Sequence, residues 1–231
     1  MTITVIIPAL NEERVIGRTL SHTGRLGFDA ITVVDGGSTD RTREIVESAM
    51  VPAGERIRLL TAPQGRARQL NAGAASADSE VLLFLHADTR LPENARDVVE
   101  KTFGDRACVG GRFDVRFDTD TPIARTVARF MNLRSRLSGI STGDQALFVR
   151  RRVFEELGRF ADIPLMEDIE FSRRLKRAGT VAALRDQVVT AYRRWQTQGP
   201  IRTILLMWTL RLLYWLGVNP FTLHKMYQVV R

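Results

Sequence analysis

Alternation between β-branched runs and helical periodicity constrains this sequence more than any other feature. Thr2–Pro8 and Ala30–Asp35 are strand-like runs, and the periodic segment Glu12–Arg25 between them is typical of a helix. Strand-like runs at Ile57–Thr61 and Glu80–His86 continue the series. Further helical patterns occupy Asp40–Met50, Arg66–Ser76 and Pro92–Thr102, the last with Pro92 expected at its first position. We therefore predict an α/β fold with a mostly parallel, Rossmann-like central sheet and helices on both faces.

The second hundred residues predict shorter and less regular elements. We expect strands at Cys108–Phe117 and Ala146–Val149, and helices at Pro122–Leu137, Arg151–Leu157 and Glu167–Arg177. No internal repeat or low-complexity linker interrupts the chain, whose 231 residues are 44% hydrophobic. This length and composition suit one large α/β domain better than two independent ones.

The single cysteine, Cys108, excludes a disulfide framework and a multi-thiolate zinc site. The segment that opens with Met1 has no basic stretch followed by an apolar one, so a secretory signal peptide is not expected. Both observations lead us to expect a cytoplasmic protein.

Positive charge gathers toward the C-terminal end. The net charge is +8, and no Asp or Glu follows Asp186. Six basic residues do follow it: Arg193, Arg194, Arg202, Arg211, Lys225 and Arg231. No helix-turn-helix, aromatic RNA platform or zinc finger is recognisable, so nucleic acid is not an expected partner.

The most apolar stretch, Ile201–Gly217, is interrupted by Arg202 and Arg211 and is too short to predict a membrane span. Its aromatic side chains, Trp208, Tyr214 and Trp215, suit a membrane interface. Two interpretations stay open: an amphipathic helix lying on an anionic membrane, or a helix packed on the core or in a homodimer interface.

Polar clusters follow four of the predicted strands. They are Pro8-Ala9-Leu10-Asn11-Glu12-Glu13, Asp35-Gly36-Gly37-Ser38-Thr39-Asp40, Gly65 to Gly73, and His86-Ala87-Asp88. Ligands of open α/β sheets bind beyond the carboxyl ends of the strands. An aspartate after one strand is most often a helix cap, but four such clusters in sequence order predict a binding site.

These clusters resemble the family 2 glycosyltransferases of GT-A fold, whose first strand ends in Pro-x-x-Asn-Glu and whose second ends in Asp-Asp-Gly-Ser-x-Asp. The segments Ala146–Arg151 and Glu167–Leu175 resemble the acceptor-side strand and the Glu-Asp helix of that family. The pair Asp-Gly-Gly-Ser-Thr-Asp and His-Ala-Asp is also similar to a bacterial subgroup of radical-SAM- or selenodomain-associated transferases. The resemblance covers about Thr2 to Gly179.

This resemblance implies a division of the chain. Residues 1–199 form the GT-A domain, with a nucleotide-binding half at about 1–105 and an acceptor half at about 106–199. Residues 200–231 form an apolar and basic helical extension.

The resemblance implies donor-site roles for the first three clusters. Pro8, Leu10, Asn11, Glu12 and Asp35 correspond to the residues that hold the nucleobase and ribose, and carboxylates accept hydrogen bonds from ribose hydroxyls. For Arg66 and Arg68, beside the Gly65 loop, either a pyrophosphate site or a solvated helix face is possible.

The metal motif departs from the family pattern, because His86-Ala87-Asp88 replaces Asp-x-Asp. Ala87 and Asp88 are expected at the donor, and Asp88 with donor oxygens and waters suits Mg²⁺ or Mn²⁺. His86 would favour Mn²⁺ if it bound the metal directly, and a contact with ribose or a neighbouring side chain is the alternative. A second departure, Gly36 in place of the second Asp, leaves the nucleobase open.

On the acceptor side, Asp168 corresponds to the general base, with Glu167 beside it, and capping of the helix is the alternative role. Asp144 and Gln145 suggest a hydrophilic acceptor contact. Arg194 and Trp195 are further acceptor candidates, although no Gln stands three residues before Arg194, as it does in processive members.

Together these features predict an inverting, metal-dependent hexosyltransferase-type enzyme that uses a nucleoside diphosphate sugar, UDP-linked by preference, and a small or lipid-linked acceptor. A nucleotide-sugar-binding protein or a nucleotidyltransferase on a related sheet is the alternative. Nucleotidyltransferases carry a Gly-rich loop and a Lys after the first strand, and Pro8-Ala9-Leu10-Asn11-Glu12 has neither.

Overall fold

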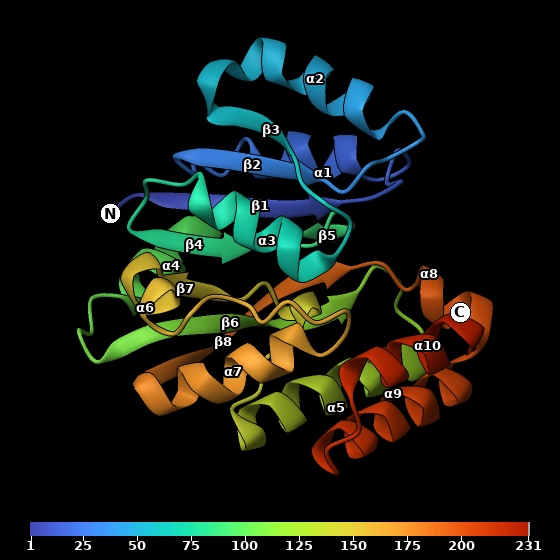
Figure 1. Ribbon diagram of the computed structural model, residues 1–231. Coiled ribbons are helices and arrows are strands. Elements are labelled where there is room, and N and C mark those ends of the chain that lie inside the picture. The colour runs from blue at the N-terminus through green and yellow to red at the C-terminus, as the bar shows by residue number, and fades with distance from the viewer. Residues whose placement is uncertain (231) are drawn as a thin grey trace.

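The computed structural model describes residues 1–230, without the side chains of Pro52, Glu55, Arg194, Thr197, Gln198 and residues 228–230. Its strands are β1 (Ile3–Ala9), β2 (Ala30–Asp35), β3 (Ile57–Thr61), β4 (Val81–Phe84), β5 (Thr89–Arg90), β6 (Cys108–Phe117), β7 (Phe148–Arg150) and β8 (Thr180–Thr190). Within the described residues they form one eight-stranded sheet of order β3-β2-β1-β4-β7-β6-β8-β5 (Figure 1).

Helices cover this sheet on both sides (Figure 1). They are α1 (Ile16–Thr23), α2 (Thr42–Ala53), α3 (Arg66–Ala75), α4 (Ala95–Thr102), α5 (Pro122–Ser138), α6 (Arg151–Glu156), α7 (Glu167–Ala178), α8 (Arg193–Gln198), α9 (Pro200–Trp215) and α10 (Pro220–Val230). Two short 3₁₀ helices, η1 (Gly54–Arg56) and η2 (Gly143–Gln145), lie in loops.

The sheet consists of two parallel blocks joined by one antiparallel strand. Strands β3, β2, β1 and β4 run parallel, as do β6 and β8. Strand β7 is antiparallel to both β4 and β6, and the short β5 is antiparallel to β8. The predicted α/β fold with a mostly parallel sheet is confirmed.

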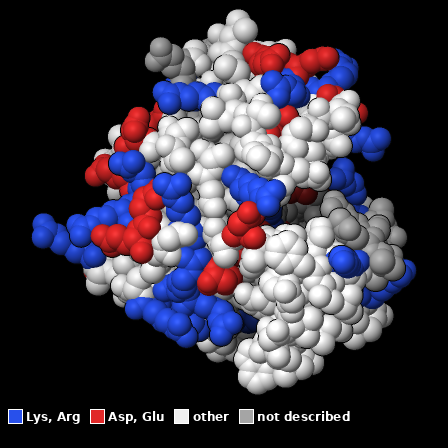
Figure 2. Space-filling view, viewed as in Figure 1, with Lys and Arg blue, Asp and Glu red and all other residues white. Residues whose placement is uncertain are grey.

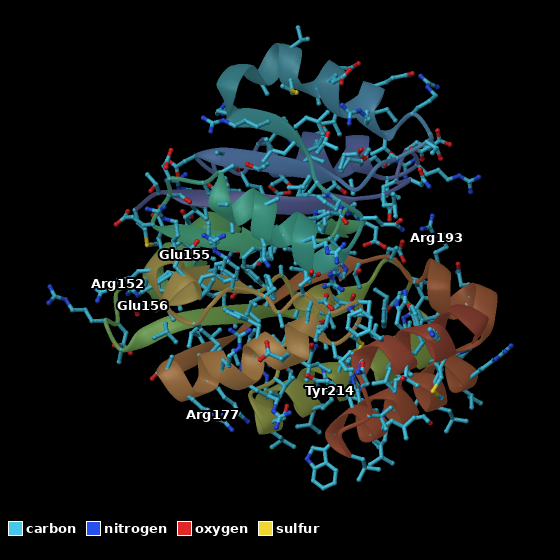
Figure 3. The ribbon with its side chains drawn as sticks, in the orientation of Figure 1. Arg152, Glu155, Glu156, Arg177, Arg193 and Tyr214 are labelled. Atoms are coloured by element: carbon cyan, nitrogen blue, oxygen red, sulfur yellow. The ribbon has the colours of Figure 1, made fainter. Side chains whose placement is uncertain are left out.

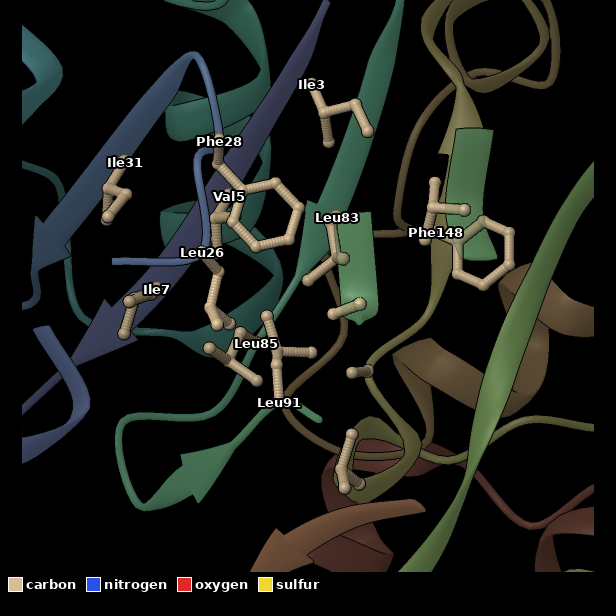
Figure 4. Close-up of a cluster of buried hydrophobic side chains, with 14 of the residues drawn as sticks. Ile3, Val5, Ile7, Leu26, Phe28, Ile31, Leu83, Leu85, Leu91 and Phe148 are labelled. Carbon is tan, nitrogen blue, oxygen red and sulfur yellow. The ribbon is translucent and has the colours of Figure 1, made fainter. Parts of the chain in front are cut away.

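Apolar side chains fill both faces of the sheet. On one face Val5, Leu83 and Phe148 pack with residues of α1, α2 and α4 (Figure 4). On the other face, residues of α3, α6 and α7 surround Ile6 and Leu82. Helix α3 approaches closely because Gly73 has no side chain: a Cβ there would lie 2.5 Å from Ile6 Cγ2. This packing fixes the ends of β1, β2 and β4 relative to the start of α3.

Several predicted boundaries were wrong. Pro92 does not begin α4, because it lies in the preceding turn and accepts the Ala95 N–H at 3.0 Å. The predicted strand at Ala146–Val149 begins only at Phe148, because Ala146 adopts a left-handed conformation with φ of 46°. The long strand β8 was not anticipated, and Pro220 begins a second C-terminal helix.

The C-terminal helices α9 and α10 pack beside α5 and the start of α7 (Figure 1). Leu210 of α9 and Leu223 of α10 are buried against Met166, the residue before α7. One face of α9 therefore packs on the core, while Trp208 and Trp215 on its other face are 67% and 74% exposed. Within the described residues, no helix has the length and apolar character needed to cross a membrane.

Candidate active site

The turn after β1 is tied to the loop after β2 by hydrogen bonds. Asn11, with φ of 56°, donates its backbone N–H to Ser38 Oγ at 2.9 Å and accepts the Thr39 N–H on Oδ1 at 2.8 Å. The Glu12 N–H donates to Thr42 Oγ1 at 2.7 Å. An asparagine tolerates this left-handed conformation better than most residues. The first two polar clusters thus form one edge with a fixed shape.

Asp35 ends β2 and is fully buried at this edge. Its carboxylate accepts the N–H groups of Gly37 and Ser38 at 3.1 and 3.2 Å, and Arg43 Nη1 lies 3.4 Å away. Pro8 lies in β1 beside β2, and the half-buried Leu10 follows the strand. The structure therefore brings the predicted nucleobase and ribose residues together.

Gln69 explains why Gly36 stands where the family pattern has a second Asp. The Gln69 amide is buried and donates to the carbonyl oxygens of Ala9 and Val34 at 2.9 and 2.8 Å. A Cβ on Gly36 would lie 3.0 Å from three atoms of that amide. The glutamine of α3 thus fills the space that a side chain at position 36 would need.

Arg66, in the first turn of α3, lies among four carboxylates. Its Nε is 3.2 Å from Glu167 Oε1. Burial lowers the pKa of Arg66, but the charges of Glu167, Asp168, Asp144 and Asp88 outweigh it and raise the pKa above its usual value. Residues from α3, the loop after β4, η2 and α7 therefore converge on one cation.

The start of α7 presents Glu167 and Asp168 to this cluster. Glu167 is 3% exposed, and burial raises its pKa against the opposing effect of Arg66. Asp168 accepts the Gly143 N–H at 2.8 Å and the Ile169 N–H at 2.7 Å. The predicted pair of acidic residues is thus held at the N-terminus of α7.

The segment η2 connects the clusters. His86 Nδ1 lies 3.3 Å from Asp144 Oδ1. A Cβ at Gly143 would collide with the guanidinium of Arg66 and with the His86 ring. A small cavity here is lined by residues that include Arg66, His86, Gly143 and Asp168. Glycine at position 143 is what allows the donor-side arginine and the acceptor-side aspartate to approach one another.

The residues at the predicted metal position suit a metal that is shared with a ligand. Asp88 is half-buried, and one carboxylate oxygen is 3.4 Å from Thr89 Oγ1. His86 Nε2 is enclosed and has no hydrogen-bond partner among the described residues. The described part of the chain contains no group of three His, Cys, Asp or Glu side chains able to hold a metal alone. A hard cation with one protein carboxylate and further oxygens from a diphosphate fits this donor set.

Other predicted site residues lie apart from this cluster. Arg68 forms an exposed ion pair with Asp162 at 2.8 Å. Ala87 is buried in the core, and its carbonyl accepts the Thr19 hydroxyl. Trp195 stacks on Tyr192, its ring centroid 6.3 Å away, so it packs on protein. The side chain of Arg194 lies outside the described residues.

Sequence reasoning missed Arg134 of α5 and Arg211 of α9. Both side chains are close enough to Asp168 and Asp144 for those charges to affect their pKa values. The signal available in the sequence was the run of basic residues without acidic partners, but it did not distinguish these two arginines from their exposed neighbours.

A parallel sheet with carboxylates at its carboxyl edge is the arrangement of the GT-A glycosyltransferases, and solved structures of that class share this fold. S. aureus TarS superposes with a TM-score of 0.67 at 16% identity, over 83% of this chain and 60% of that one. The mannosyltransferase PcManGT of Pyrobaculum calidifontis, solved with GDP-Man and Mn²⁺, gives a TM-score of 0.67 at 20% identity, over 90% of this chain and 64% of that one.

The chain belongs to glycosyl transferase family 2, whose model matches residues 4–158. An uncharacterized glycosyltransferase of Nostoc sp. is 36% identical over 43% of this chain and 32% of its own. The probable glycosyltransferase YdaM of Bacillus subtilis is 29% identical over 77% of this chain and 47% of its own. The chain thus spans less than half the length of these two relatives.

Proposed function

We propose that this protein transfers a sugar, with inversion, from a UDP-linked or related nucleoside diphosphate donor to a small or lipid-linked acceptor. The observation that carries the proposal is the cluster around Gly143, where Arg66 pairs with Glu167, Asp168 accepts the Gly143 N–H and His86 lies against Asp144. Asp88 is close enough for its charge to affect the pKa of Arg66. TarS has been crystallised with UDP-GlcNAc and PcManGT with GDP-Man and Mn²⁺, which supports this class of donor.

The proposed roles follow the two sides of the cluster. The turn at Asn11 and the buried Asp35 bind the nucleoside, while Asp88 and His86 would hold Mn²⁺ or Mg²⁺, which offsets charge on the departing diphosphate. Asp168 accepts the acceptor's proton as its oxygen bonds to the anomeric carbon and the bond to the diphosphate breaks. Arg66 adds positive charge where the nucleoside diphosphate leaves.

The donor half, about residues 1–105, and the acceptor half, about 106–199, are proposed on the same basis. Arg211 lies beyond residue 199, but the charge of Asp168 affects its pKa. Residues 200–231 are proposed as the apolar and basic extension, whose helix α9 contributes Arg211 to the acceptor side.

Thermal unfolding with a panel of UDP-, GDP- and TDP-sugars, with and without Mn²⁺, tests the donor. A ligand that binds the native state raises Tm, so the correct nucleotide should raise it most and should raise it further with the metal present. Analysis of the products separates transferase from nucleotidyltransferase, because sugar transfer releases a nucleoside diphosphate. No Tm rise with any donor would contradict the proposal.

The lipid-linked acceptor is supported by the surface formed by α5, α9 and α10, which we call the basic-apolar face. Its large apolar side chains are more than 40% exposed: Ile123, Phe130, Leu133, Leu137, Ile201, Leu205, Trp208, Leu212, Trp215, Phe221 and Met226. These three helices contain no Asp or Glu, but do contain Arg125, Arg129, Arg202 and Lys225. Figure 2 shows a broad area without acidic side chains over α9 and α10. This combination complements an anionic membrane, on which we propose that the protein lies peripherally.

Replacing Trp208 and Trp215 together by Glu tests this surface without disturbing the core. The wild-type protein should co-sediment with vesicles of phosphatidylglycerol, and the double variant should not. A matched variant with Glu at the exposed Val51, on α2, should bind as the wild type does. An unbound wild-type protein, or one whose dimer the double variant dissociates, would instead indicate that a second copy covers this face.

A further inference from the structure

Arg134 and Arg211 come from two distant parts of the chain and meet at the acceptor side. Arg134 lies in the second half of α5, and Arg211 follows Leu210, which packs on Met166 at the start of α7. The Arg211 charge acts on Arg134, and both arginines are influenced by Asp168 and Asp144. Tyr214, one turn along α9, is influenced by Asp168 and Glu170 and is marked in Figure 3. The fold therefore holds two guanidinium groups close enough to the proposed base for its charge to affect both.

These two guanidinium groups are not neutralised by any ion pair within the described residues. Nε and Nη2 of Arg134 are enclosed and have no hydrogen-bond partner there. Burial, together with the like charge of Arg211, lowers the pKa of Arg134 to about 10, so it remains charged at neutral pH. By contrast, the buried Arg112 has a direct carboxylate partner in Asp114. Enclosed donors without an acceptor are costly, and an anion bound between two arginines would satisfy them.

The neighbouring aspartates do not fill this role. Both carboxylate oxygens of Asp168 accept backbone N–H groups, from Gly143 and Ile169. Asp144 lies against His86. The carboxylates that influence Arg211 are Asp168 and Asp144, whereas Asp88 of the proposed metal site influences Arg66. Leu210 of α9 packs on Met166, which precedes the acceptor-side helix α7, so we assign the pair to the acceptor side.

We propose that Arg134 and Arg211 bind a phosphate group carried by the acceptor and so position its nucleophilic hydroxyl near Asp168. The assignment to an acceptor rests on the proposed function, but the phosphate site itself does not. Two planar guanidinium groups provide paired donors that match phosphate oxygens. The phosphate belongs either to a lipid, whose chain would continue onto the basic-apolar face, or to a water-soluble acceptor.

Binding of inorganic phosphate and of dodecyl phosphate, measured calorimetrically with UDP and Mn²⁺ at saturation, tests this site. Because UDP already occupies the donor edge, binding of the phosphate probes to that edge does not contribute to the measured heat. We expect Arg211→Gln and Arg134→Gln each to weaken phosphate binding about tenfold or more, as for loss of a hydrogen bond to a charged group. The exposed Arg18→Gln on α1 and Arg177→Gln on α7 lie outside the basic-apolar face and serve as controls, which should bind as the wild type does.

The outcomes separate the two proposals and the two sources of phosphate. Tighter binding of dodecyl phosphate, lost in Arg211→Gln, identifies a lipid phosphate, and equal binding of both probes identifies a soluble one. Phosphate binding that Arg211→Gln leaves unchanged, or no binding of either probe, overturns the site while UDP binding still supports the donor proposal. If Arg134→Gln does not fold, Arg211→Gln alone decides. If UDP does not bind, GDP and TDP are tested in its place, and failure of all three contradicts the proposed function. The phosphate measurement without a nucleotide then still tests the pair.

Discussion

The nucleoside edge, formed by the turns after β1 and β2, and the acceptor side of this site differ in how completely their polar groups are paired. At the nucleoside edge, Asn11 and Asp35 accept backbone N–H groups, and Gln69 donates to two carbonyls. On the acceptor side, Arg134 Nε and Nη2 and Gln145 Nε2 are enclosed and have no hydrogen-bond partner within the described residues. Both regions are built on the same sheet, so the difference comes from the loops and helices and not from the core.

This difference indicates two ways of preparing a binding site. A surface whose own hydrogen bonds are complete keeps its shape before the ligand arrives, so little order has to be gained on binding. A surface that encloses charge without partners gains its missing contacts only with the ligand. We infer that the nucleoside edge has its final shape before the nucleoside binds. The enclosed donors of the acceptor side gain hydrogen-bond partners only when the acceptor binds.

Asp168→Asn is expected to have the largest effect. The amide keeps the size of the side chain but cannot take up a proton, so transfer should fall by about 10²- to 10⁴-fold, the range for positioned proton transfer. Donor affinity should stay near normal because the donor edge is built without Asp168. Single-turnover assays and UDP titrations measure the two effects.

Glu170→Gln, on the same helix, is the control for Asp168→Asn. Glu170 is paired with Arg174, so its loss should leave transfer close to that of the wild type. Near-normal transfer by Asp168→Asn would show that Asp168 caps the helix and is not the general base. The acceptor side would then have no identified base.

Asp88→Asn should separate the metal-dependent part of donor binding from the preformed nucleoside edge. In Mn²⁺ the affinity for the donor should fall at least tenfold, since even the indirect partners of metal ligands are worth about 10- to 100-fold. Without the metal, wild type and variant should bind UDP equally. Asp78→Asn, at an exposed position, is the control. Equal affinities in Mn²⁺ would place the metal elsewhere.

Gly36→Asp tests how rigid the donor edge is. The new side chain meets the buried Gln69 amide, and overpacking of this kind costs about 1–3 kcal/mol of unfolding free energy. Gln69→Ala removes the obstacle but leaves two carbonyls without their donor. The double variant should therefore be more stable than the sum of the two single effects, measured by urea unfolding. Strict additivity would mean that the edge rearranges freely.

The smallest expected effect is a pH dependence caused by Glu167. Burial raises its pKa in the folded protein above the usual 4.5, so the folded state binds a proton more readily than the unfolded state does. Its contribution to stability is then complete below pH 4.5 and declines as pH rises through the folded pKa. Urea unfolding should show the wild type losing stability relative to Glu167→Gln as the pH rises, because the variant has no proton to lose. A wild type that gains stability relative to the variant as the pH rises would show that Arg66 dominates.

The donor edge could be predicted from the sequence because its signals are local. β-branched runs define β1, β2 and β4, and the carboxyl ends of parallel strands must meet at one edge. The positions of Asp35 and Asp88 at that edge follow from this rule. The resemblance to family 2 supplied the correspondence for Asp168, which lies far along the chain.

The acceptor side depends on long-range contacts that no local pattern reveals. Strand β8 contains Arg185 and Asp186 in its middle, and it forms because it pairs with β6 over most of its length. Arg211 comes within range of the Asp168 charge because its neighbour Leu210 packs on Met166, which lies far earlier in the chain. The excess of basic residues was visible in the sequence, but not which of them turn inward.

The absence of acidic residues from α5, α9 and α10 also has a consequence for how fast and in which orientation this protein meets its partners. Charge of one sign on one side gives the molecule an electric dipole, which turns it in the field of an anionic body before the two touch. Encounter rates should therefore fall steeply as ionic strength rises, while the lifetime of a complex held by the apolar side chains changes little. The arginines and the lysine of the basic-apolar face therefore set the rate of association, and its tryptophans and leucines set the rate of dissociation.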